Sequence, residues 1–196
     1  MANDTTLFLG QWMRAPGTTG AVAPSSRRLA ETVTAPVPQR GEPVIVELGP
    51  GTGAFTAEIQ RRLGGRGHHL AVEINPRLAD FLSARHPGVD VTVADAAKLP
   101  QLLWERGLDQ ADVIVSGLPW AAFSERTQTS LLDAVAAVMG PNSAFTTFAY
   151  SFAKPFPPAR RFRRRLHDSF EEVVTGRTVW GNLPPAFVYH VRRPRP

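Results

Sequence analysis

The sequence predicts an α/β protein in which a mainly parallel β-sheet lies between two layers of helices. Between residues 43 and 149, short apolar runs of strand character alternate regularly with stretches of helical periodicity. Such alternation is typical of parallel strands joined by crossover helices that cover both faces of the sheet. Near the C-terminus, two strand-like runs are separated only by residues 181–185. This connection is short enough for a hairpin, so an antiparallel pair is expected to complete the sheet.

The length and composition indicate one domain without a metal site. The chain has 196 residues, 43% of them hydrophobic, which is enough for one core. No apolar run reaches the roughly 20 residues that span a bilayer, and the N-terminus lacks the features of a signal peptide. We therefore expect a cytoplasmic protein. The chain has no cysteine, and its five histidines do not show the spacing of metal ligands, so metal catalysis is not expected.

The N-terminal residues 1–40 are expected to form a helical segment in front of a main domain of residues 41–196. Residues 5–13 carry apolar side chains at helical spacing, among them Phe8 and Trp12. This face either packs on the core as an ordinary first helix, or covers a bound cofactor while Phe8 and Trp12 dip into a lipid interface. A second short helix is expected at 26–33.

The first half of the main domain begins with a buried strand at 44–48 and a helix at 54–63. The helix buries Phe55, Ile59 and Leu63 at helical spacing and ends at two glycines. A second strand follows at 69–74. Pro76 then opens the next helix, since proline suits the first position of a helix. An apolar run predicts the third strand at 89–94.

The second half continues the alternation with strands at 112–116 and 144–149. Between them a long helix is expected from 124 to 139, ended by a Gly-Pro pair. Three apolar residues then recur every four positions, which predicts an amphipathic helix with its arginines outward; these are Phe162, Leu166 and Phe170. The two final strands are expected at 172–180 and 186–191.

A glycine-rich turn connects the first strand to the first helix of the main domain. Gly49, Gly51 and Gly53 permit positive φ and lack Cβ atoms, so a ligand can lie against the backbone while helix amides point at it. The turn therefore indicates a ligand that contains a nucleotide. The glycines also fit the dinucleotide pattern, and Glu73 stands at the distance of a ribose-binding acid. By themselves, the glycines and Glu73 do not distinguish a dinucleotide from another ligand that contains a nucleotide.

Three further features favour S-adenosylmethionine over a dinucleotide. Glu47 precedes the first glycine by two residues, a third glycine is present, and Asp95-Ala96 follows the third strand. This set resembles the class I S-adenosylmethionine-dependent methyltransferases. The resemblance implies that the turn and Glu47 hold the methionine end. It also implies that Glu73 binds both ribose hydroxyls and that Asp95 with Ala96 faces the adenine amino group. The fold implied is a Rossmann-like, seven-stranded, three-layer α/β/α unit whose seventh strand inserts antiparallel between the fifth and sixth.

A second motif, Ser116-Gly-Leu-Pro-Trp120, ends the fourth strand at the edge where open α/β sheets bind ligands. It resembles the Asn/Asp-(Pro/Leu)-Pro-aromatic motif of amino methyltransferases, whose first side chain and following carbonyl bind the target amine. Here Gly117 and Leu118 occupy those positions, beside the cofactor. An adenine amine would lack its side-chain acceptor, which argues against a nucleobase substrate. A turn that only packs is the alternative.

The chain as a whole resembles the bacterial phospholipid N-methyltransferases. The segments that carry this resemblance are Phe8-Leu-Gly-Gln-Trp12, residues 20–26 and residues 180–189. The resemblance implies methylation of phosphatidylethanolamine and its methylated forms toward phosphatidylcholine, with S-adenosylhomocysteine as the product. The alternative is an rRNA adenine N6-methyltransferase. Against it stand Gly117 and the short tail after the last strand, where the rRNA enzymes carry a helical domain, so nucleic acid is not the expected partner.

The amine must lose a proton before it can accept a methyl group. An alkylammonium titrates near pH 10.4, so only about one molecule in 10³ is neutral at pH 7. Tyr150, Tyr189 and His190 are the candidates to accept or relay that proton, unless they only pack. Trp120 and Tyr150, with Phe123 as a further candidate, are also expected to enclose a methylated, cationic head group by cation–π attraction.

The net charge of +5 indicates an anionic partner, either a membrane surface or nucleic acid. The densest basic cluster is residues 160–165, where five arginines include Arg160, Arg161 and Arg164. We expect these side chains to contact anionic phospholipid on the inner face of the membrane, or a substrate phosphate. A solvated helix face, RNA phosphate and a generally basic proteome are the alternatives.

Overall fold

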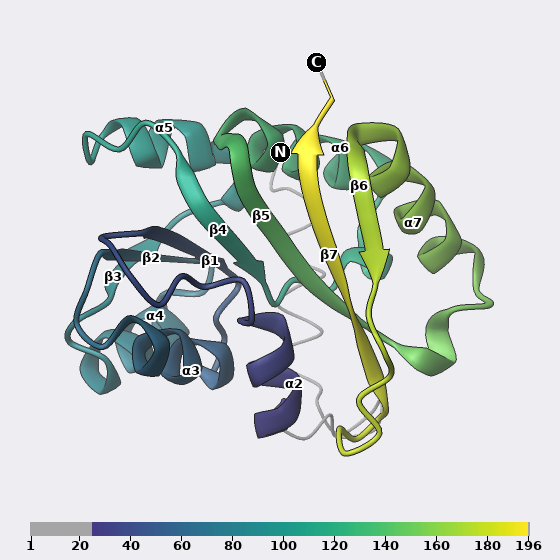
Figure 1. Cartoon of the computed structure of the whole chain (residues 1–196), viewed down its shortest axis with the longest axis horizontal. Coiled ribbons are helices and arrows are strands. Elements are labelled where there is room, and N and C mark those ends of the chain that lie inside the picture. Colours follow the sequence, from purple (N-terminus) through teal and green to yellow (C-terminus); the bar gives the residue numbers. More distant parts are fainter. Residues whose placement is uncertain (1–24, 196) are drawn as a thin grey trace.

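A computed structural model describes residues 25–195 of the chain. It contains a seven-stranded sheet with helices on both faces (Figure 1), which confirms the predicted α/β fold. Phe8 and Trp12 lie outside the described residues. None of the helices within residues 25–195 is both long enough and apolar enough to cross a membrane.

The strands follow the predicted order along the chain. They are β1 (Val44–Leu48), β2 (His68–Glu73), β3 (Asp90–Val93), β4 (Ala111–Ser116), β5 (Met139–Tyr150), β6 (Phe170–Thr175) and β7 (Ala186–Pro194). In space their order is β3-β2-β1-β4-β5-β7-β6. Strands β1 to β5 pair in parallel, whereas β7 pairs antiparallel with both β5 and β6. The seventh strand therefore inserts antiparallel between the fifth and sixth, as expected.

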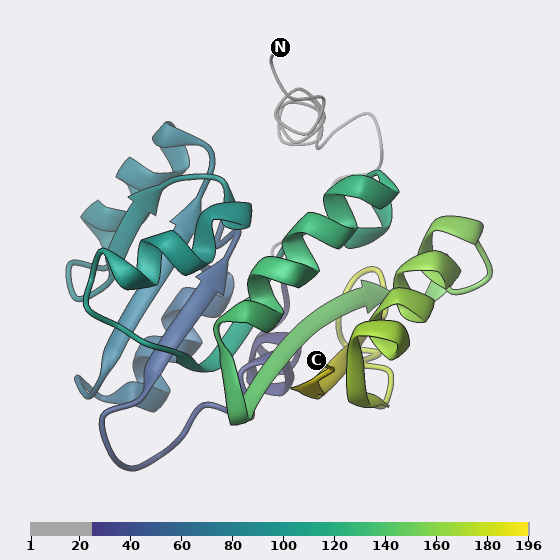
Figure 2. The same ribbon diagram turned by 90° about the horizontal axis from the view of Figure 1, so that it is seen from above.

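The helices form two layers (Figure 2). One layer contains α2 (Arg27–Val33), α3 (Ala54–Leu63) and α4 (Pro76–Arg85), and the other contains α5 (Leu99–Trp104), α6 (Glu125–Ala137) and α7 (Pro157–Ser169). Three short 3₁₀ helices, η1 (Ala96–Lys98), η2 (Trp120–Ala122) and η3 (Ser151–Ala153), follow β3, β4 and β5. These three 3₁₀ helices therefore stand at the carboxyl ends of β3, β4 and β5.

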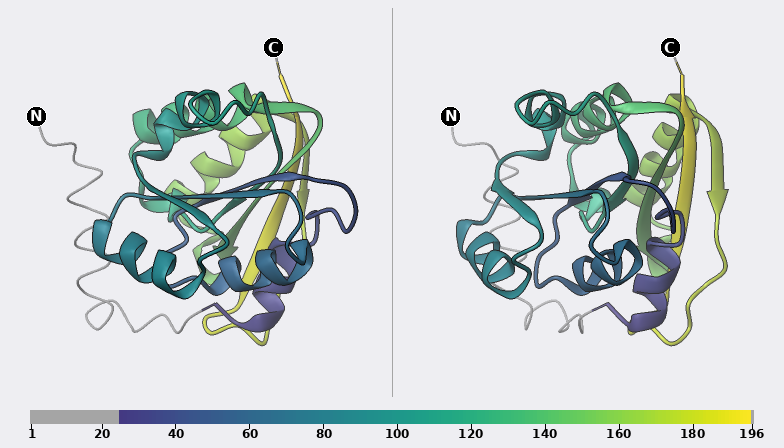
Figure 3. Two further views of the ribbon diagram at one scale, coloured as in Figure 1. Left: turned by 90° about the vertical axis from the view of Figure 1, so that its left-hand side faces the viewer. Right: turned by 60° about the vertical axis from the view of Figure 1, so that its left-hand side comes forward.

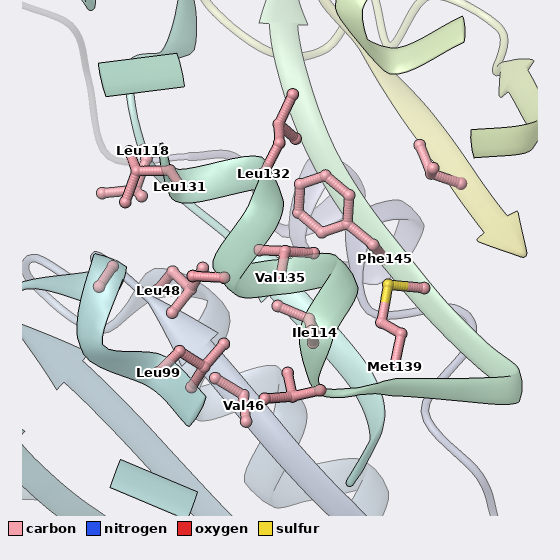
Figure 4. Packing of buried hydrophobic residues seen from close by; sticks show 14 of the residues in the cluster. Val46, Leu48, Leu99, Ile114, Leu118, Leu131, Leu132, Val135, Met139 and Phe145 are labelled. Carbon is pink, nitrogen blue, oxygen red and sulfur yellow. The ribbon is translucent and has the colours of Figure 1, made fainter. Parts of the chain in front are cut away.

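A hydrophobic core lies on each side of the sheet because successive side chains of a strand point to opposite faces. On the side of α5, α6 and α7, the helix residues Leu132 and Val135 lie over Ile114 and Phe145 (Figure 4). On the other side, buried residues of α2 and α3 cover Ile45. Residues 27–33 are therefore part of the globular body.

The boundary between α6 and β5 differs from the prediction. The helix ends at Ala137, and β5 begins at Met139 instead of residue 144. Met139 pairs with Ala111 and Ala144 pairs with Val113, so the pairing shifts register between them. Ser143 stabilises this irregularity, since its hydroxyl donates to the carbonyl of Ala111 at 2.6 Å. The helix α5 was also not predicted.

The connection between β6 and β7 is longer than predicted. β6 ends at Thr175, and residues 176–185 form a loop that returns to β7. Figure 3 shows this loop extending past the sheet beside α2. Ser26, which caps α2, donates its backbone N–H to Oδ1 of Asn182 at 2.8 Å. The loop is thus tied to the beginning of the described chain.

Candidate active site

The glycine turn adopts the backbone that its residues predict. Gly49, Gly51 and Gly53 have φ values of 66°, 56° and 88°, which glycine adopts without strain. A Cβ atom at Gly49 would lie 2.7 Å from Cδ2 of Leu118. The turn therefore packs closely against the motif that follows β4.

Glu73 ends β2 with its carboxylate held by two backbone amides. One oxygen accepts from Gly51 at 3.1 Å, and the other accepts from Asn75 at 2.9 Å. The side chain is buried, and this desolvation raises its pKa, although the two hydrogen bonds act in the opposite direction. Each oxygen retains a further lone pair, so the carboxylate can accept two hydroxyl groups from a ligand.

Glu73, Asp95 and Ala96 line one crevice together with Gly49 and Leu118. Oδ1 of Asp95 accepts from the backbone N–H of Ala97 at 2.9 Å, which holds the carboxylate in place. The remaining wall of the crevice is apolar and comprises Val72, Ile74, Ala94, Phe123 and Leu131. Two fixed carboxylates on an apolar slot match a ribose diol and an adenine ring. The residues present therefore fit S-adenosylmethionine.

Glu47 does not line this crevice. Its side chain is fully buried beneath the glycine turn, where Oε2 accepts from the hydroxyl of Thr56 at 2.8 Å. Nε2 of His69, which is also buried, lies 3.2 Å from the same oxygen. The structure thus places Glu47 between β1, β2 and α3, beneath the turn and close enough to Glu73 for its charge to add to the effect of burial in raising the pKa of that carboxyl. Its other oxygen, Oε1, is buried without a hydrogen-bond partner among the described residues.

A second cavity of about 160 Å³ adjoins the crevice and shares Leu118 with it. Its walls come from strands β5 and β7, the segment after β4, and the helices η2, η3 and α7. The lining residues are Gly117, Leu118, Pro119, Trp120, Ala121, Ala122, Phe148, Ala149, Tyr150, Ala153, Ala159, Phe162 and Tyr189. No carboxylate or side-chain amide is among them. We call this cavity the aromatic pocket.

Trp120 is a buried wall of the aromatic pocket. Its indole N–H donates to Oγ of Ser116 at 3.0 Å, and its ring stacks on Phe162 with centroids 4.9 Å apart. Its carbonyl accepts from Nε2 of Gln128 at 2.7 Å. The ring is therefore oriented from three sides before any substrate enters.

The two tyrosines reach the aromatic pocket from neighbouring strands. Tyr150 stacks on Phe152, and Tyr189 meets Phe162 and Phe187 edge to face. Burial raises the pKa of both phenols, and the charge of Arg163 opposes this rise at Tyr189. Both hydroxyls therefore stay protonated near neutral pH. They can accept a hydrogen bond from an ammonium group or relay its proton, but neither is a ready phenolate base.

His190 is not brought to the aromatic pocket. It neighbours Tyr189 on β7, so its side chain points to the opposite face of the sheet. Its Nε2 would lie 3.7 Å from a Cβ atom added at Gly176. Burial lowers its pKa, and Arg192 adds to this effect. His190 shares this face of the sheet with Tyr150, but it pairs with Thr146, four residues before Tyr150 on β5, and it is not among the residues that line the aromatic pocket.

Gly117 stands where the two sites meet. Its N–H donates to the carbonyl of Leu48 at 2.8 Å, and an added Cβ atom would lie 2.6 Å from the carbonyl oxygen of Gly49. Because a backbone carbonyl at that distance must move, the position has no room for a side chain. The absence of an amide acceptor thus has a steric cause.

The predicted basic cluster divides in two. Arg161 and Arg165 lie 3.5 and 2.9 Å from the carboxylate of Glu125, whereas Arg160 and Arg164 are exposed. The first pair contacts α6, and the second pair is open to solvent. In residues 25–195, no three acidic or histidine side chains gather as metal ligands would.

Several site residues were missed by sequence reasoning. Ser116 and Gln128 hold Trp120, and Phe148 and Ala159 line the aromatic pocket. Ser116 could have been found, because it ends the strand that carries the motif. The other three come from separate elements, and no local pattern marks them. Phe123, expected with the aromatic wall, lies in the cofactor crevice.

Comparison with known proteins shows which family and which characterised protein the chain is similar to. The chain matches the family described as a methyltransferase domain over residues 45–142. It is 34% identical over 192 residues to an ornithine lipid N-methyltransferase of Singulisphaera acidiphila, and the match covers 96% of each chain.

Two solved structures share the fold at low sequence identity. TrmN from Thermus thermophilus gives a TM-score of 0.65 at 16% identity, over 84% of this chain and 48% of TrmN. Fibrillarin from Aeropyrum pernix, a structure with natively bound S-adenosylmethionine, gives 0.60 at 15% identity, over 80% of this chain and 68% of fibrillarin.

Proposed function

The chain belongs to the class I S-adenosylmethionine-dependent methyltransferases, and we propose that it methylates the amine of an amino lipid at a membrane surface. The observation that carries this proposal is the composition of the aromatic pocket. Its polar side chains are those of Tyr150, Tyr189 and Trp120, and the indole N–H of Trp120 already donates to Ser116. An aliphatic amine attached to an apolar body suits such a lining, whereas a nucleobase amine needs acceptors that Gly117 cannot carry.

The cofactor crevice and the aromatic pocket divide the chemistry between them. Bound in the crevice, S-adenosylmethionine supplies a methyl group on a positively charged sulfur. The neutral amine nitrogen forms the new C–N bond as the C–S bond breaks, and S-adenosylhomocysteine remains. This in-line displacement depends mainly on positioning. Holding the amine nitrogen and the methyl group in one geometry should supply most of the acceleration.

The chain's own residues orient the amine and handle its proton. The hydroxyls of Tyr150 and Tyr189 accept hydrogen bonds from the ammonium form and relay its proton outward. The rings of Trp120 and the two tyrosines enclose a cationic head group, which becomes permanently charged with successive methylation. A pocket without a carboxylate also releases such a cation more readily.

The lipid amine has two candidate sources. The similar enzyme from Singulisphaera acidiphila is an ornithine lipid N-methyltransferase, and the resemblance to phospholipid N-methyltransferases points to phosphatidylethanolamine and its methylated forms. Ornithine lipid and phosphatidylethanolamine both offer a primary aliphatic amine on a lipid. The relative supports ornithine lipid as the first substrate to test, at the inner face of the membrane.

Transfer of labelled methyl groups tests the proposal. The purified protein would be incubated with labelled S-adenosylmethionine and vesicles that contain ornithine lipid, phosphatidylethanolamine or neither, and in parallel with ribosomal RNA. We expect label in at least one amino lipid and none in RNA. A Glu73→Gln variant serves as the control for cofactor binding. Label in RNA with none in either lipid would contradict the proposed function and leave the family assignment unchanged.

A further inference from the structure

Two loops at the carboxyl edge of the sheet carry large apolar side chains in water. The first is residues 151–156, which follow β5, and the second is residues 176–185, between β6 and β7. Together they carry half of the exposed large hydrophobic residues of the described chain. Their exposed fractions are 60% for Phe152, 55% for Phe156, 76% for Trp180 and 71% for Leu183. We call these two loops the docking edge.

The docking edge is a single, internally bonded surface. The N–H of Ser151 donates to the carbonyl of Pro185 at 2.8 Å, which joins the first loop to the second. Val179 bridges to Ala186 at the start of β7. Asn182 is buried and bonds to the chain on both sides, through Ser26 and Pro184. The exposed rings therefore project from a fixed base.

The docking edge stands beside the aromatic pocket. Tyr150 and Ala153 line the pocket, and Phe152 between them stacks on Tyr150 with centroids 5.7 Å apart. In Figure 1 both loops lie at the lower right of the molecule, below α7, whereas α5 lies at the upper left. A surface that covers these loops would therefore face the pocket.

The charge of the docking edge is positive. Neither loop contains aspartate or glutamate, and both contain a basic residue, Lys154 and Arg177. The ammonium of Lys154 lies 4.2 Å from the ring centroid of Phe187, next to the pocket wall. Arg28 of α2 packs beside Gly181 of the second loop. Exposed aromatic rings among cations match the interface of an anionic bilayer, where such rings sit at the level of the head groups.

We propose that the docking edge inserts into the head-group region of an anionic lipid bilayer and so places the aromatic pocket over its substrate. This inference rests on the proposed lipid substrate but assigns the contact to residues 151–156 and 176–185. These differ from the N-terminal segment and from the arginines of 160–165. Insertion of rings with flanking cations holds a protein in the interface plane without a spanning helix.

Sedimentation with vesicles tests this inference in the full-length protein. The vesicles would contain phosphatidylglycerol as the anionic lipid. The test variant is Phe156→Ser with Trp180→Ser, because neither residue lines the pocket and serine suits the N-cap position that Phe156 occupies. Trp104→Ser is the matched control, since this ring is 79% exposed at the end of α5, away from the docking edge.

We expect the double variant to lose vesicle affinity by about tenfold or more, and the control to change by less than about twofold. Lys154→Gln with Arg177→Gln should weaken the salt dependence of binding, because fewer cations remain to be screened. Equal vesicle binding by the double variant and the wild type would overturn the inference. So would a wild type that ignores vesicles and binds structured RNA through these same rings.

A second measurement separates this inference from the proposed function. With amino lipid dissolved in detergent, the double variant should keep wild-type turnover, while its turnover on vesicles falls with its binding. Loss of turnover in detergent as well would show that these residues act in catalysis and not in docking. A wild type that binds vesicles through the docking edge but transfers no label to lipid would contradict the proposed function and leave the docking inference unchanged.

Discussion

The cofactor crevice and the aromatic pocket meet at Leu118 but are held together by different forces. In the crevice, the carboxylates of Glu73 and Asp95 are fixed by backbone amides, those of Asn75 and Ala97 two residues on and that of Gly51 in the glycine turn. In the pocket, rings from η2, α7 and β7 fix one another, as in the stack of Trp120 on Phe162. Residues 25–195 offer no hydrogen-bond partner to the hydroxyls of Tyr150 and Tyr189.

The difference has a functional reason. A cofactor of constant shape is best bound by polar groups that are oriented before it arrives, since their order then costs nothing on binding. A head group that changes its size and charge with each methylation needs an apolar enclosure with few fixed partners. The crevice should therefore be sensitive to single polar changes, and the aromatic pocket should lose turnover without losing the cofactor.

The largest effect is expected at Gly117, which lines the aromatic pocket and packs against Gly49 of the crevice. Gly117→Asn would place a Cβ atom 2.6 Å from the carbonyl of Gly49, and such crowding costs about 3 kcal/mol or roughly 150-fold. We expect both cofactor affinity and lipid turnover to fall, as measured by calorimetry and label transfer.

Gly88→Ala is the matched control for Gly117→Asn, because its Cβ atom would lie at an ordinary 3.5 Å from Gln60. This control should behave as the wild type. Normal cofactor affinity in Gly117→Asn would show that the two sites are not coupled through this contact.

The next largest effect is expected within the crevice. Glu73→Ala removes two acceptor oxygens from the ribose position, and charged hydrogen bonds of this kind contribute about 1.5–3 kcal/mol. S-adenosylmethionine should bind roughly 10- to 150-fold more weakly in calorimetric titration. Turnover at saturating cofactor should fall much less. An unchanged dissociation constant in the folded variant would exclude Glu73 from the cofactor site.

In the aromatic pocket we expect a smaller effect, which lowers turnover and leaves cofactor affinity unchanged. Tyr189→Phe and Tyr150→Phe each remove one hydroxyl that relays a proton, so turnover should fall about tenfold while cofactor affinity stays constant. His190→Gln is the control, since His190 is not among the residues that line the aromatic pocket. If His190→Gln lowers turnover as much as the tyrosine variants, the relay does not run through the pocket.

The smallest effect is a pH dependence that belongs to the crevice alone. Burial raises the pKa of Glu73 in the folded chain, so protonation begins at a higher pH than for a free glutamate near 4.3. Hydroxyl donors require the ionised form, and cofactor affinity should therefore fall as the pH drops through the raised pKa of Glu73, above the range in which a free glutamate is protonated.

The effect of Glu73 on stability has the opposite sign. Because the folded state binds this proton more tightly than the unfolded state, the contribution of Glu73 to stability falls as the pH rises through the same window. Acid should thus weaken cofactor binding without unfolding the protein through this group. Glu73→Gln should abolish the pH dependence of binding, and a dependence that survives this substitution must come from another group.

The sequence alone determined the cofactor half of the protein. Positive φ values at Gly49, Gly51 and Gly53, and acids at the ends of β2 and β3, are local properties of the chain. Residues a few positions apart decide them, because glycine tolerates the turn and parallel strands end at one edge. The alternation of strands and helices is also a local property of the chain, and it predicted the fold.

Only the tertiary structure decided the aromatic pocket and the role of several predicted residues. The contact of Trp120 with Phe162 and the placement of Tyr189 join elements far apart in the sequence. Alternation along β7 put Tyr189 and His190 on opposite faces, but only long-range packing brought Tyr189 and Tyr150, which also lie on opposite faces, into one pocket at the end of the sheet. Glu47 fits the motif by sequence, and the structure adds that its buried carboxylate accepts from the hydroxyl of Thr56. Side-chain periodicity assigns residues to faces, and long-range packing decides what each face encloses.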